Sequence, residues 1–438
     1  MRTGGKITAT IEILDDFDSR RVPLKTAIAD WGRNNRYAGA KDRAWISGLC
    51  LDCLRRKASL SAAVKDGSTR MRVLAALVLL WRMPIAELSD AVEDEHGPGA
   101  LTDDERATLN AADLSAQTEN DAPDWIAPLF ERAFGAAAGA ELAGLSARAD
   151  IDLRINALKA TAEKAFPALK SVRAETVPAT QMAARIAAPD PAVKAPAVTV
   201  IPAFNKGWVE VQDLGSQLAA LAAGEIGGRQ VLDYCAGGGG KTLALGARMN
   251  GTGQLYAFDI DARRLKPLYH RAKRAGLKNL QIRSPIDEAP LADLIGKMDV
   301  VFVDAPCTGS GTWRRHPDAK WRLTEKQLTK RIAEQDEVLR VAADFVKPGG
   351  RMVYVTCSVF VEENEDRIAG FLAENLIFRQ SSALDEIASV DVDAATFLKA
   401  HVTDGGGLRL TPMRTGTDGF YVAVLRRDET ARRNGDED

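Results

Sequence analysis

With 438 residues the chain is too long for a single compact core, so we expect two or three domains. Hydrophobic and charged fractions of 46% and 27% exclude a disordered or low-complexity protein, and a net charge of −2 excludes nucleic-acid recognition by overall charge alone. Five cysteines, no apolar leader and no apolar run long enough to span a bilayer argue against a disulfide scaffold and a membrane protein. We therefore expect a cytoplasmic protein, and a monomer.

Residues 1–145 are predicted to form an all-α domain that ends in an acidic connector and a helix pair. Apolar residues recur at three-to-four spacing from residue 7 to about residue 91. A basic loop with one aromatic residue lies between two of these helices and contains Arg33, Arg36, Lys41 and Arg43. Such a loop suits a phosphate backbone with one stacked base, and the alternative is a solvated inter-helix loop.

Cys50 and Cys53 form a C-x-x-C pair within this helical region. The pair could be half of a metal site or a redox pair, but no second C-x-x-C or Cys/His pair stands nearby. Leucines surround both cysteines at helical spacing. We therefore predict two core-facing helix residues, and no metal site in the chain.

The rest of the chain changes from helical to mixed patterns. Residues 146–205 are predicted to form a small α+β subdomain, with a strand after Asp150 and a helix that begins at Thr161. Strands and helices alternate through 206–428, and 429–438 is a polar tail. The alternation predicts an α/β, Rossmann-like domain with a doubly wound sheet whose last strand is reversed.

A glycine cluster follows the first strand of this domain, which ends at Asp233. The loop from Cys235 to Lys241 precedes a helix, where backbone N–H groups can approach a ligand. It does not complete the dinucleotide motif G-x-G-x-x-G, because Thr242 stands where the last glycine of that motif belongs. It does not complete a phosphate-loop motif either. The loop can therefore be interpreted either as a cofactor cradle or as a tight structural turn. The next strand ends at Asp259, which is placed to hold ribose hydroxyls or to be a solvated carboxylate.

Two cysteines follow buried strands at the same predicted sheet edge. Cys307 lies in Asp304-Ala-Pro-Cys, and Cys357 lies in Thr-Cys-Ser. A thiolate adds readily to carbon 6 of a pyrimidine and activates carbon 5, and a protonated carboxylic acid at ring nitrogen 3 draws charge off the ring. A second thiol or a water could then assist release. Because the two cysteines stand beside Asp304 and the glycine loop, we predict that they are reactive and are not inert buried thiols.

A basic, aromatic-interleaved segment follows Cys307. Arg315, His316, Lys320 and Trp321 are predicted to clamp RNA around a flipped or unpaired base, and the alternative is a solvated polar loop.

Taken together, these motifs resemble the Nop/Sun-type RNA cytosine-5 methyltransferases. The resemblance covers about 146–428 and is carried by the Val211–Gln217, Asp233–Thr242, Asp304–Gly311, Arg315–Trp321, Tyr354–Ser358, Glu362–Glu365 and Asp418–Tyr421 segments. The helical region 1–145 is more loosely similar to the NusB-like RNA-binding domain of bacterial ribosomal-RNA members.

The resemblance implies a role for each matching residue. Cys357 would be the nucleophile and Cys307 would help release the product, with Asp304 between cofactor and base and Lys241 completing the catalytic set. The residues implied to hold S-adenosylmethionine are Cys235, Ala236, Gly237, Gly238, Gly239, Gly240, Lys241, Asp259 and Asp304. Two departures from the family pattern are Gly238, where members usually have proline, and the segment 283–287, which has no acid at the position that would lie near the adenine, with Asp287 as a substitute candidate.

We therefore expect S-adenosylmethionine-dependent methylation of carbon 5 of a cytosine in RNA, with ribosomal RNA as the first candidate and transfer RNA as the second. Two alternatives remain. One is a catalytically silent RNA-binding protein on the same scaffold, and the other is a nucleotide-dependent oxidoreductase.

Overall fold

The computed structural model describes residues 1–115, 120–190, 193 and 195–430, so most of the predicted polar tail at 429–438 lies outside the described residues. The chain forms two compact units. The first, the helical unit, comprises residues 1–148, 188–196 and 313–323. The second, the catalytic unit, comprises 149–187, 197–312 and the residues from 324 onward. The segment 313–323 thus belongs to the helical unit, although the sequence analysis placed it within 206–428.

The helical unit is built on the predicted apolar stripes. Ile7, Ile13 and Phe17 of the first helix are almost completely buried in its core, as are Leu49 and Leu74. Its helices are α1 (Thr3–Arg20), α2 (Leu24–Asn34), α3 (Ala40–Arg55), α4 (Lys57–Val64), α5 (Thr69–Ala75), α6 (Ile85–Glu93), α7 (Asp103–Ala111), α8 (Ala127–Phe134), α9 (Ala138–Leu145) and α15 (Pro317–Arg322). Cys50 and Cys53 lie on α3 with 0% and 1% of their surface exposed, which confirms that they face the core.

A small antiparallel sheet opens the catalytic unit, in the order β2-β3-β1-β4. Its strands are β1 (Ile151–Ile155), β2 (Glu175–Val177), β3 (Thr180–Ile186) and β4 (Val209–Val211), and the short helices α10 (Ala162–Leu169) and α11 (Pro202–Asn205) accompany them. Thr161 caps α10 by accepting a hydrogen bond from the N–H of Lys164. Because β4 pairs with β1, this sheet extends past the boundary predicted at residue 205.

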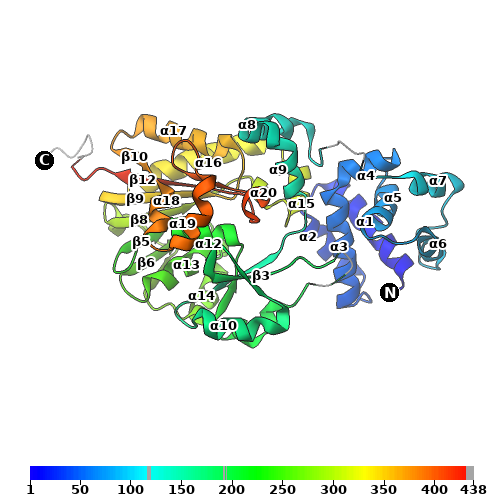
Figure 1. Cartoon of the computed structure of the whole chain (residues 1–438), viewed down its shortest axis with the longest axis horizontal. Helices are drawn as coiled ribbons and strands as arrows, with labels where there is room; N and C mark the ends of the chain where they lie inside the picture. Colours follow the sequence, from blue (N-terminus) through cyan, green and yellow to red (C-terminus); the bar gives the residue numbers. More distant parts are fainter. Residues whose placement is uncertain (116–119, 191–192, 194, 431–438) are drawn as a thin grey trace. The chain divides into compact units, whose positions relative to one another are not determined.

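The main sheet has the order β10-β12-β9-β8-β5-β6-β7, with β11 paired to β12 (Figure 1). Strands β5 to β9 are parallel, and β12 inserts antiparallel beside β9, which confirms the doubly wound sheet with a reversed last strand. The strands are β5 (Gln230–Asp233), β6 (Gln254–Phe258), β7 (Leu280–Arg283), β8 (Met298–Asp304), β9 (Val346–Thr356), β10 (Phe378–Ser381), β11 (Leu408–Leu410) and β12 (Phe420–Arg427).

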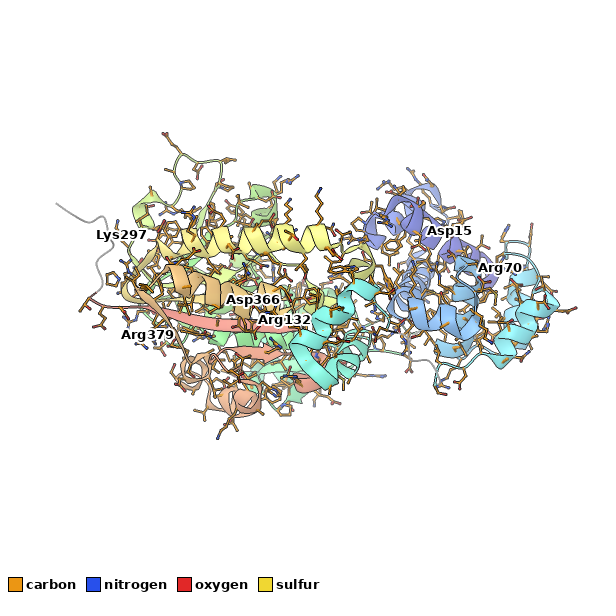
Figure 2. The ribbon with its side chains drawn as sticks, turned by 90° about the horizontal axis from the view of Figure 1, so that it is seen from above. Asp15, Arg70, Arg132, Lys297, Asp366 and Arg379 are labelled. Atoms are coloured by element: carbon orange, nitrogen blue, oxygen red, sulfur yellow. The ribbon has the colours of Figure 1, made fainter. Side chains whose placement is uncertain are left out.

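Helices cover both faces of the main sheet. Figure 1 shows α16 and α17 on one side and α12, α13 and α14 on the other, and Figure 2 shows α16 and α17 again, with Asp366 of α17 labelled. The helices are α12 (Leu214–Leu221), α13 (Gly240–Met249), α14 (Ala262–Ala275), α16 (Glu325–Ala343), α17 (Glu365–Glu374), α18 (Ala383–Ala388), α19 (Val392–Leu398) and α20 (Pro412–Thr415). None of the helices in the described residues is long and apolar enough to cross a bilayer.

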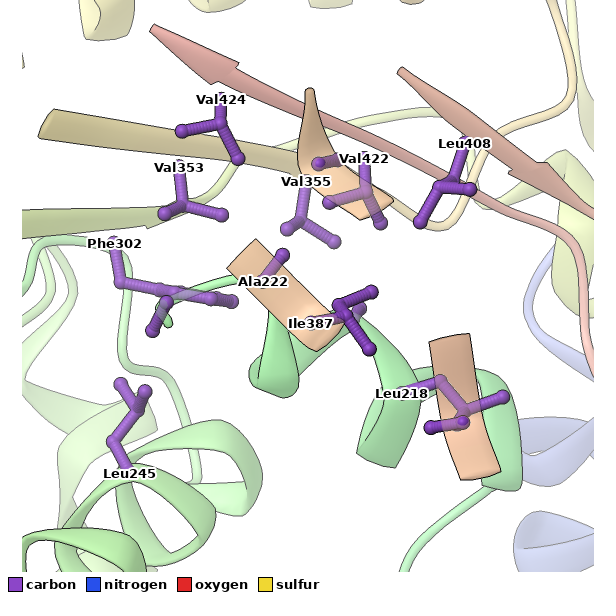
Figure 3. Packing of buried hydrophobic residues seen from close by; sticks show 14 of the residues in the cluster. Leu218, Ala222, Leu245, Phe302, Val353, Val355, Ile387, Leu408, Val422 and Val424 are labelled. Atoms are coloured by element: carbon purple, nitrogen blue, oxygen red, sulfur yellow. The ribbon is translucent and has the colours of Figure 1, made fainter. Parts of the chain in front are cut away.

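Successive strand residues point to opposite faces, and both faces are apolar. Val353 and Val355 of β9 pack with Phe302 and Leu245 in one core, part of which Figure 3 shows. Tyr354, between the two valines, packs on the opposite face against residues of α16 and α17. The sheet is therefore a rigid layer that fixes where each strand ends.

Candidate active site

The candidate site lies at the carboxyl ends of β5, β8 and β9. From β5 the chain goes to β6 and β7 on one side of the sheet and then returns to β8 on the other side. Such a switch point, where connections leave in opposite directions, is where open α/β sheets bind ligands. Asp233 ends β5, Asp304 ends β8, and Cys357 directly follows β9. The fold therefore gathers the residues predicted to carry the chemistry at one edge.

The loop between β5 and α13 is a tight glycine turn that could cradle a ligand. Gly237 and Gly239 have φ angles of 50° and 84°, which favour glycine. A Cβ atom on Gly239 would lie 2.3 Å from the side chain of Leu268. Ala236 N–H donates to the Phe258 carbonyl at 2.8 Å, which fastens the loop to β6. The first N–H groups of α13 have no intrahelical acceptor, so they are available to a ligand.

Asp259, at the end of β6, holds this loop in place. Its carboxylate accepts the N–H of Gly237 at 3.0 Å and that of Asp261 at 2.9 Å, and Arg264 lies 3.1 Å away. The side chain is only 2% exposed. The predicted ribose contact of Asp259 stays a prediction, while its hydrogen bond to the loop is a role that the sequence analysis did not assign.

Asp233 is a buried carboxyl group beside the cradle. One oxygen accepts the Thr242 hydroxyl at 2.6 Å, and the other, Oδ1, has no hydrogen-bond partner among the described residues. Burial, followed by the nearby carboxylates, raises the pKa of Asp233 to about 7. An unpaired polar atom beside a glycine cradle fits a polar ligand such as the predicted cofactor.

The two strand-end cysteines meet at this edge. Their Sγ atoms lie 3.4 Å apart although 50 residues separate them in the chain, and both side chains are half-buried. The pKa of Cys307 is raised. The causes, in order, are its hydrogen bond with the Cys357 sulfur, burial and the Glu363 carboxylate. The arrangement presents two sulfur atoms within reach of one small planar ring.

Lys241 and Asp304 form an ion pair next to the cysteines. Lys241 Nζ lies 2.8 Å from Asp304 Oδ1 and 5.1 Å from the ring centroid of Phe420. Burial alone would lower the pKa of Lys241, but the charge and hydrogen bond of Asp304, together with Cys357, raise that pKa above the ordinary value. The ammonium group therefore stays charged beside Cys357. Cys235, at the start of the cradle, is a half-buried thiol whose pKa is raised chiefly by burial.

The basic residues predicted to bind RNA in the helical unit are placed differently from one another. Arg36 and Lys41 are exposed. Arg33 is exposed but paired with Asp30, and Arg43 donates to the carbonyls of Ala38 and Gly32 at 2.9 and 3.0 Å. Arg43 is also exposed, but its guanidinium group is bonded to the backbone that joins α2 to α3.

The segment 313–323 differs from its predicted role as a clamp. Lys320 is 0% exposed and donates to the Arg55 carbonyl at 3.1 Å and the Ser146 hydroxyl at 3.0 Å. Trp321 donates its indole N–H to the Leu54 carbonyl at 2.6 Å. Because these polar groups are bonded within the helical unit, the RNA contacts predicted for Lys320 and Trp321 are corrected to structural anchors. His316 is exposed and Arg315 is half-buried.

Two buried polar residues beside the cysteines received no individual role from the sequence. Glu363 and Gln335 are both 0% exposed and bonded to the Cys307 loop. Glu363 belongs to the motif Glu362–Glu365, so its position was visible in the sequence, but its partners depend on how β8 and β9 end. Gln335 lies in the middle of a long helix, where no sequence signal marks it.

Comparison with known proteins gives three findings. Residues 221–426 match the family described as 16S rRNA methyltransferase RsmB/F. The chain is 30% identical over 321 residues to a probable ribosomal RNA small subunit methyltransferase B of Synechocystis sp., and the alignment covers 73% of this chain and 70% of that protein. The crystal structure of PH0851 superposes with a TM-score of 0.71 at 26% identity, covering 97% of this chain and 99% of the other.

Proposed function

Since the chain belongs to the 16S rRNA methyltransferase RsmB/F family, we propose that it methylates carbon 5 of a cytosine in ribosomal RNA through a covalent cysteine adduct. The observation that carries the proposal is the 3.4 Å approach of Cys307 and Cys357 beside the Lys241–Asp304 pair. A methyl transfer to an oxygen or an exocyclic nitrogen needs no such pair of thiols, whereas carbon 5 of cytosine must first be activated by addition at carbon 6.

S-Adenosylmethionine is the cofactor, and when bound it supplies an electrophilic methyl group. The loop 235–240 and the N-terminus of α13 would hold it, with Asp259 at the ribose. The protein then activates the acceptor. Cys357 adds as a thiolate to carbon 6, and the Lys241 ammonium group, held in place by Asp304, stabilises the negative charge that develops on the ring. After methylation a water molecule takes the carbon 5 proton, the electrons of the C5–H bond restore the C5–C6 double bond, and the C6–S bond breaks to return the Cys357 thiolate, to which the Cys307 thiol can donate a hydrogen bond.

The electrostatics of the two thiols favour Cys357 as the nucleophile. The Lys241 ammonium group lies close enough to Cys357 for their charges to interact, and this interaction is one cause of the raised pKa of Lys241. The pKa of Cys307 is raised, first by its hydrogen bond with Cys357, then by burial and by the nearby Glu363 carboxylate. Cys307 is thereby kept as a neutral thiol, suited to assist release.

RNA recognition would involve basic side chains of the helical unit. We assign phosphate contacts to Arg33, Arg36 and Lys41 in the helical unit, because their side chains are exposed where α2 ends and α3 begins. Arg315 and His316, in the segment 313–323 of the same unit, are the remaining candidates for RNA contact.

The test is methylation of unmodified small-subunit ribosomal RNA with S-adenosylmethionine that carries a deuterated methyl group. The RNA is digested and its nucleosides are analysed by mass spectrometry against synthetic standards. We expect deuterated 5-methylcytidine. A label in 4-methylcytidine or in a 2′-O-methyl nucleoside would contradict the proposal. Absence of transfer together with tight binding of NAD and none of S-adenosylhomocysteine, measured by calorimetry, would favour an oxidoreductase instead.

A further inference from the structure

Glu363 is a carboxylate buried completely between the two cysteine-bearing loops. It ends the 3-10 turn Val361–Glu363 that follows β9, and its exposed surface is 0%. Its Oε1 accepts the Thr308 N–H at 2.8 Å and the Gln335 amide at 2.9 Å. Its Oε2 accepts the hydroxyl of Thr308 at 2.5 Å and also the hydroxyl of Ser358. One side chain thus bonds to both loops.

These bonded residues stand next to the cysteines in the sequence. Thr308 follows Cys307, and Ser358 follows Cys357. Gln335 also donates to the carbonyl of Pro306, the residue before Cys307, at 2.9 Å. The backbone on both sides of Cys307 is therefore held by Glu363 and its hydrogen-bonded partner Gln335.

The neighbouring residue, Asn364, does the same for Cys357. Its side-chain oxygen accepts the Thr356 hydroxyl at 2.5 Å, and its amide donates to the Ser358 carbonyl at 3.0 Å. Thr356 and Ser358 flank Cys357 on either side. The pair Glu363-Asn364 therefore fixes both strand ends from a single short turn.

The charge of Glu363 is not needed to satisfy these partners. All the donors to its carboxylate are neutral groups, and burying a charge is costly unless something offsets it. A glutamine would fill the same volume. The carboxylate differs from glutamine in its effect on Cys307, whose pKa it raises. Glu363 is hydrogen-bonded to the loops of both cysteines and lies near the Cys307 thiol. These contacts are consistent with a role in the reaction.

We propose that Glu363 is a positioning residue of the methyl transfer, which sets the separation of the two sulfur atoms by tying the Cys307 loop to the Cys357 loop. The proposal rests on the proposed function for its catalytic consequence. The geometric part concerns the free protein, and it can be measured without RNA or cofactor.

The geometric test uses diamide, an azo compound that oxidises two neighbouring thiols to a disulfide and is itself reduced to the hydrazine. The two thiols lose two protons and two electrons as the S–S bond forms. We expect rapid formation of a Cys307–Cys357 disulfide in the wild type, measured by peptide mass spectrometry. In Glu363→Ala the rate should fall at least about tenfold, because the loops lose their common anchor. Glu374→Gln, an exposed position on α17, is the control and should match the wild type.

The second test isolates the charge. Glu363→Gln keeps the volume, so the protein should fold, and the pH profile of Cys307 alkylation by iodoacetamide should shift to lower pH. In the methyl-transfer assay, Glu363→Ala should lower kcat on the order of a hundredfold with KM for RNA nearly unchanged, because a misplacement of about 1 Å near the chemistry has that effect. Glu363→Gln should fall between Glu363→Ala and the wild type.

The outcomes separate the two proposals. An unchanged disulfide rate in Glu363→Ala, or an unchanged alkylation profile in Glu363→Gln, would overturn the positioning role. If Glu363→Ala fails to fold, the alkylation profile of Glu363→Gln decides. A wild type that forms the disulfide readily but yields no 5-methylcytidine would refute the proposed function and leave the geometric result standing.

Discussion

Each unit of the protein contains a pair of cysteines, and the two pairs have opposite surroundings. Cys50 and Cys53 lie three residues apart on α3 and are packed in the apolar core of the helical unit. Cys307 and Cys357 lie on different strands, and their sulfur atoms meet at 3.4 Å. The pair that resembles a metal or redox motif in the sequence is structural, and the pair without any close spacing forms the candidate active site.

The difference lies in what surrounds the sulfur. Burial raises the pKa of Cys50 and of Cys53, so both remain neutral and behave as small apolar side chains. The second pair is half-buried beside Lys241, Asp304 and a cofactor cradle. A strand end at a topological switch point is therefore a better guide to a reactive cysteine than the spacing between two cysteines.

The largest contrast is expected from removing one cysteine of each pair. Cys357→Ala should lower methyl transfer by a factor of roughly 10⁴ or more, because in the proposed mechanism Cys357 is the group that forms the carbon 6 adduct. Cys53→Ala should leave the turnover of folded enzyme unchanged and cost about 1 kcal/mol of stability through a small core cavity. Single-turnover transfer to ribosomal RNA and urea unfolding measure the two effects. Equal turnover in Cys357→Ala and wild type would remove the basis of the comparison.

Substitution of Cys307 and substitution of Cys357 should have different effects on the reaction. Cys307→Ala should still add to the base and accept the methyl group, but turnover should fall roughly 10²- to 10⁴-fold because release loses its assisting thiol. A protein–RNA adduct that survives denaturing electrophoresis should therefore accumulate. Cys357→Ala is the matched control and should give none. An adduct in Cys357→Ala and not in Cys307→Ala would show that the two roles are reversed.

Each unit also contains a buried lysine, and the two lysines differ in the groups to which they are bonded. Lys241 is ion-paired with Asp304, whereas Lys320 donates to a carbonyl and a hydroxyl. Lys241→Met should lower kcat on the order of 10²-fold, because the ring loses a fixed positive charge as the adduct forms. Lys320→Met should leave kcat close to wild type. Steady-state methylation of both variants checks this contrast, and equal losses would mean that Lys241 acts only through folding.

The sequence predicts the catalytic unit well because its strands are short apolar runs that end at conspicuous polar residues. The order of β5 to β9, the cradle and both cysteines follow from such runs, and the structure has them within a few residues. Strands β10 and β11 were not predicted, because their short mixed sequences give no periodic signal. Lys320 and Trp321 were assigned to RNA because they stand beside a catalytic loop in the sequence, and the chain instead inserts them into the helical unit.

The polar network around Glu363 could not be predicted for a related reason. Its members come from four separate parts of the chain, and a glutamate next to other glutamates usually indicates a solvated surface. Only the pairing of β8 with β9 brings Thr308 and Ser358 to the same carboxylate. Sequence motifs can predict the residues that react. The residues that hold them in place can be identified only when the pairing of the strands is known.

The smallest expected effect concerns the stability of the helical unit. Burial lowers the pKa of Lys320 to about 7, with Asp121 opposing that shift and Arg55 and Arg56 adding to it, whereas the unfolded chain has the ordinary value. Above about pH 7 the unfolded state therefore holds a proton that the folded state lacks, so Lys320 makes the protein more stable as the pH rises.

In Lys320→Met this titration is absent. The unfolding free energy of the variant minus that of the wild type should therefore decrease by about 2 kcal/mol between pH 6.5 and pH 9. Urea unfolding at both pH values measures the difference, with the exposed Lys25→Met on α2 as a control whose difference should not change with pH. A constant difference for Lys320→Met would mean that its ammonium group remains protonated in the folded state. The contrast with Lys241 would then rest on the bonded partners alone, without a change of charge.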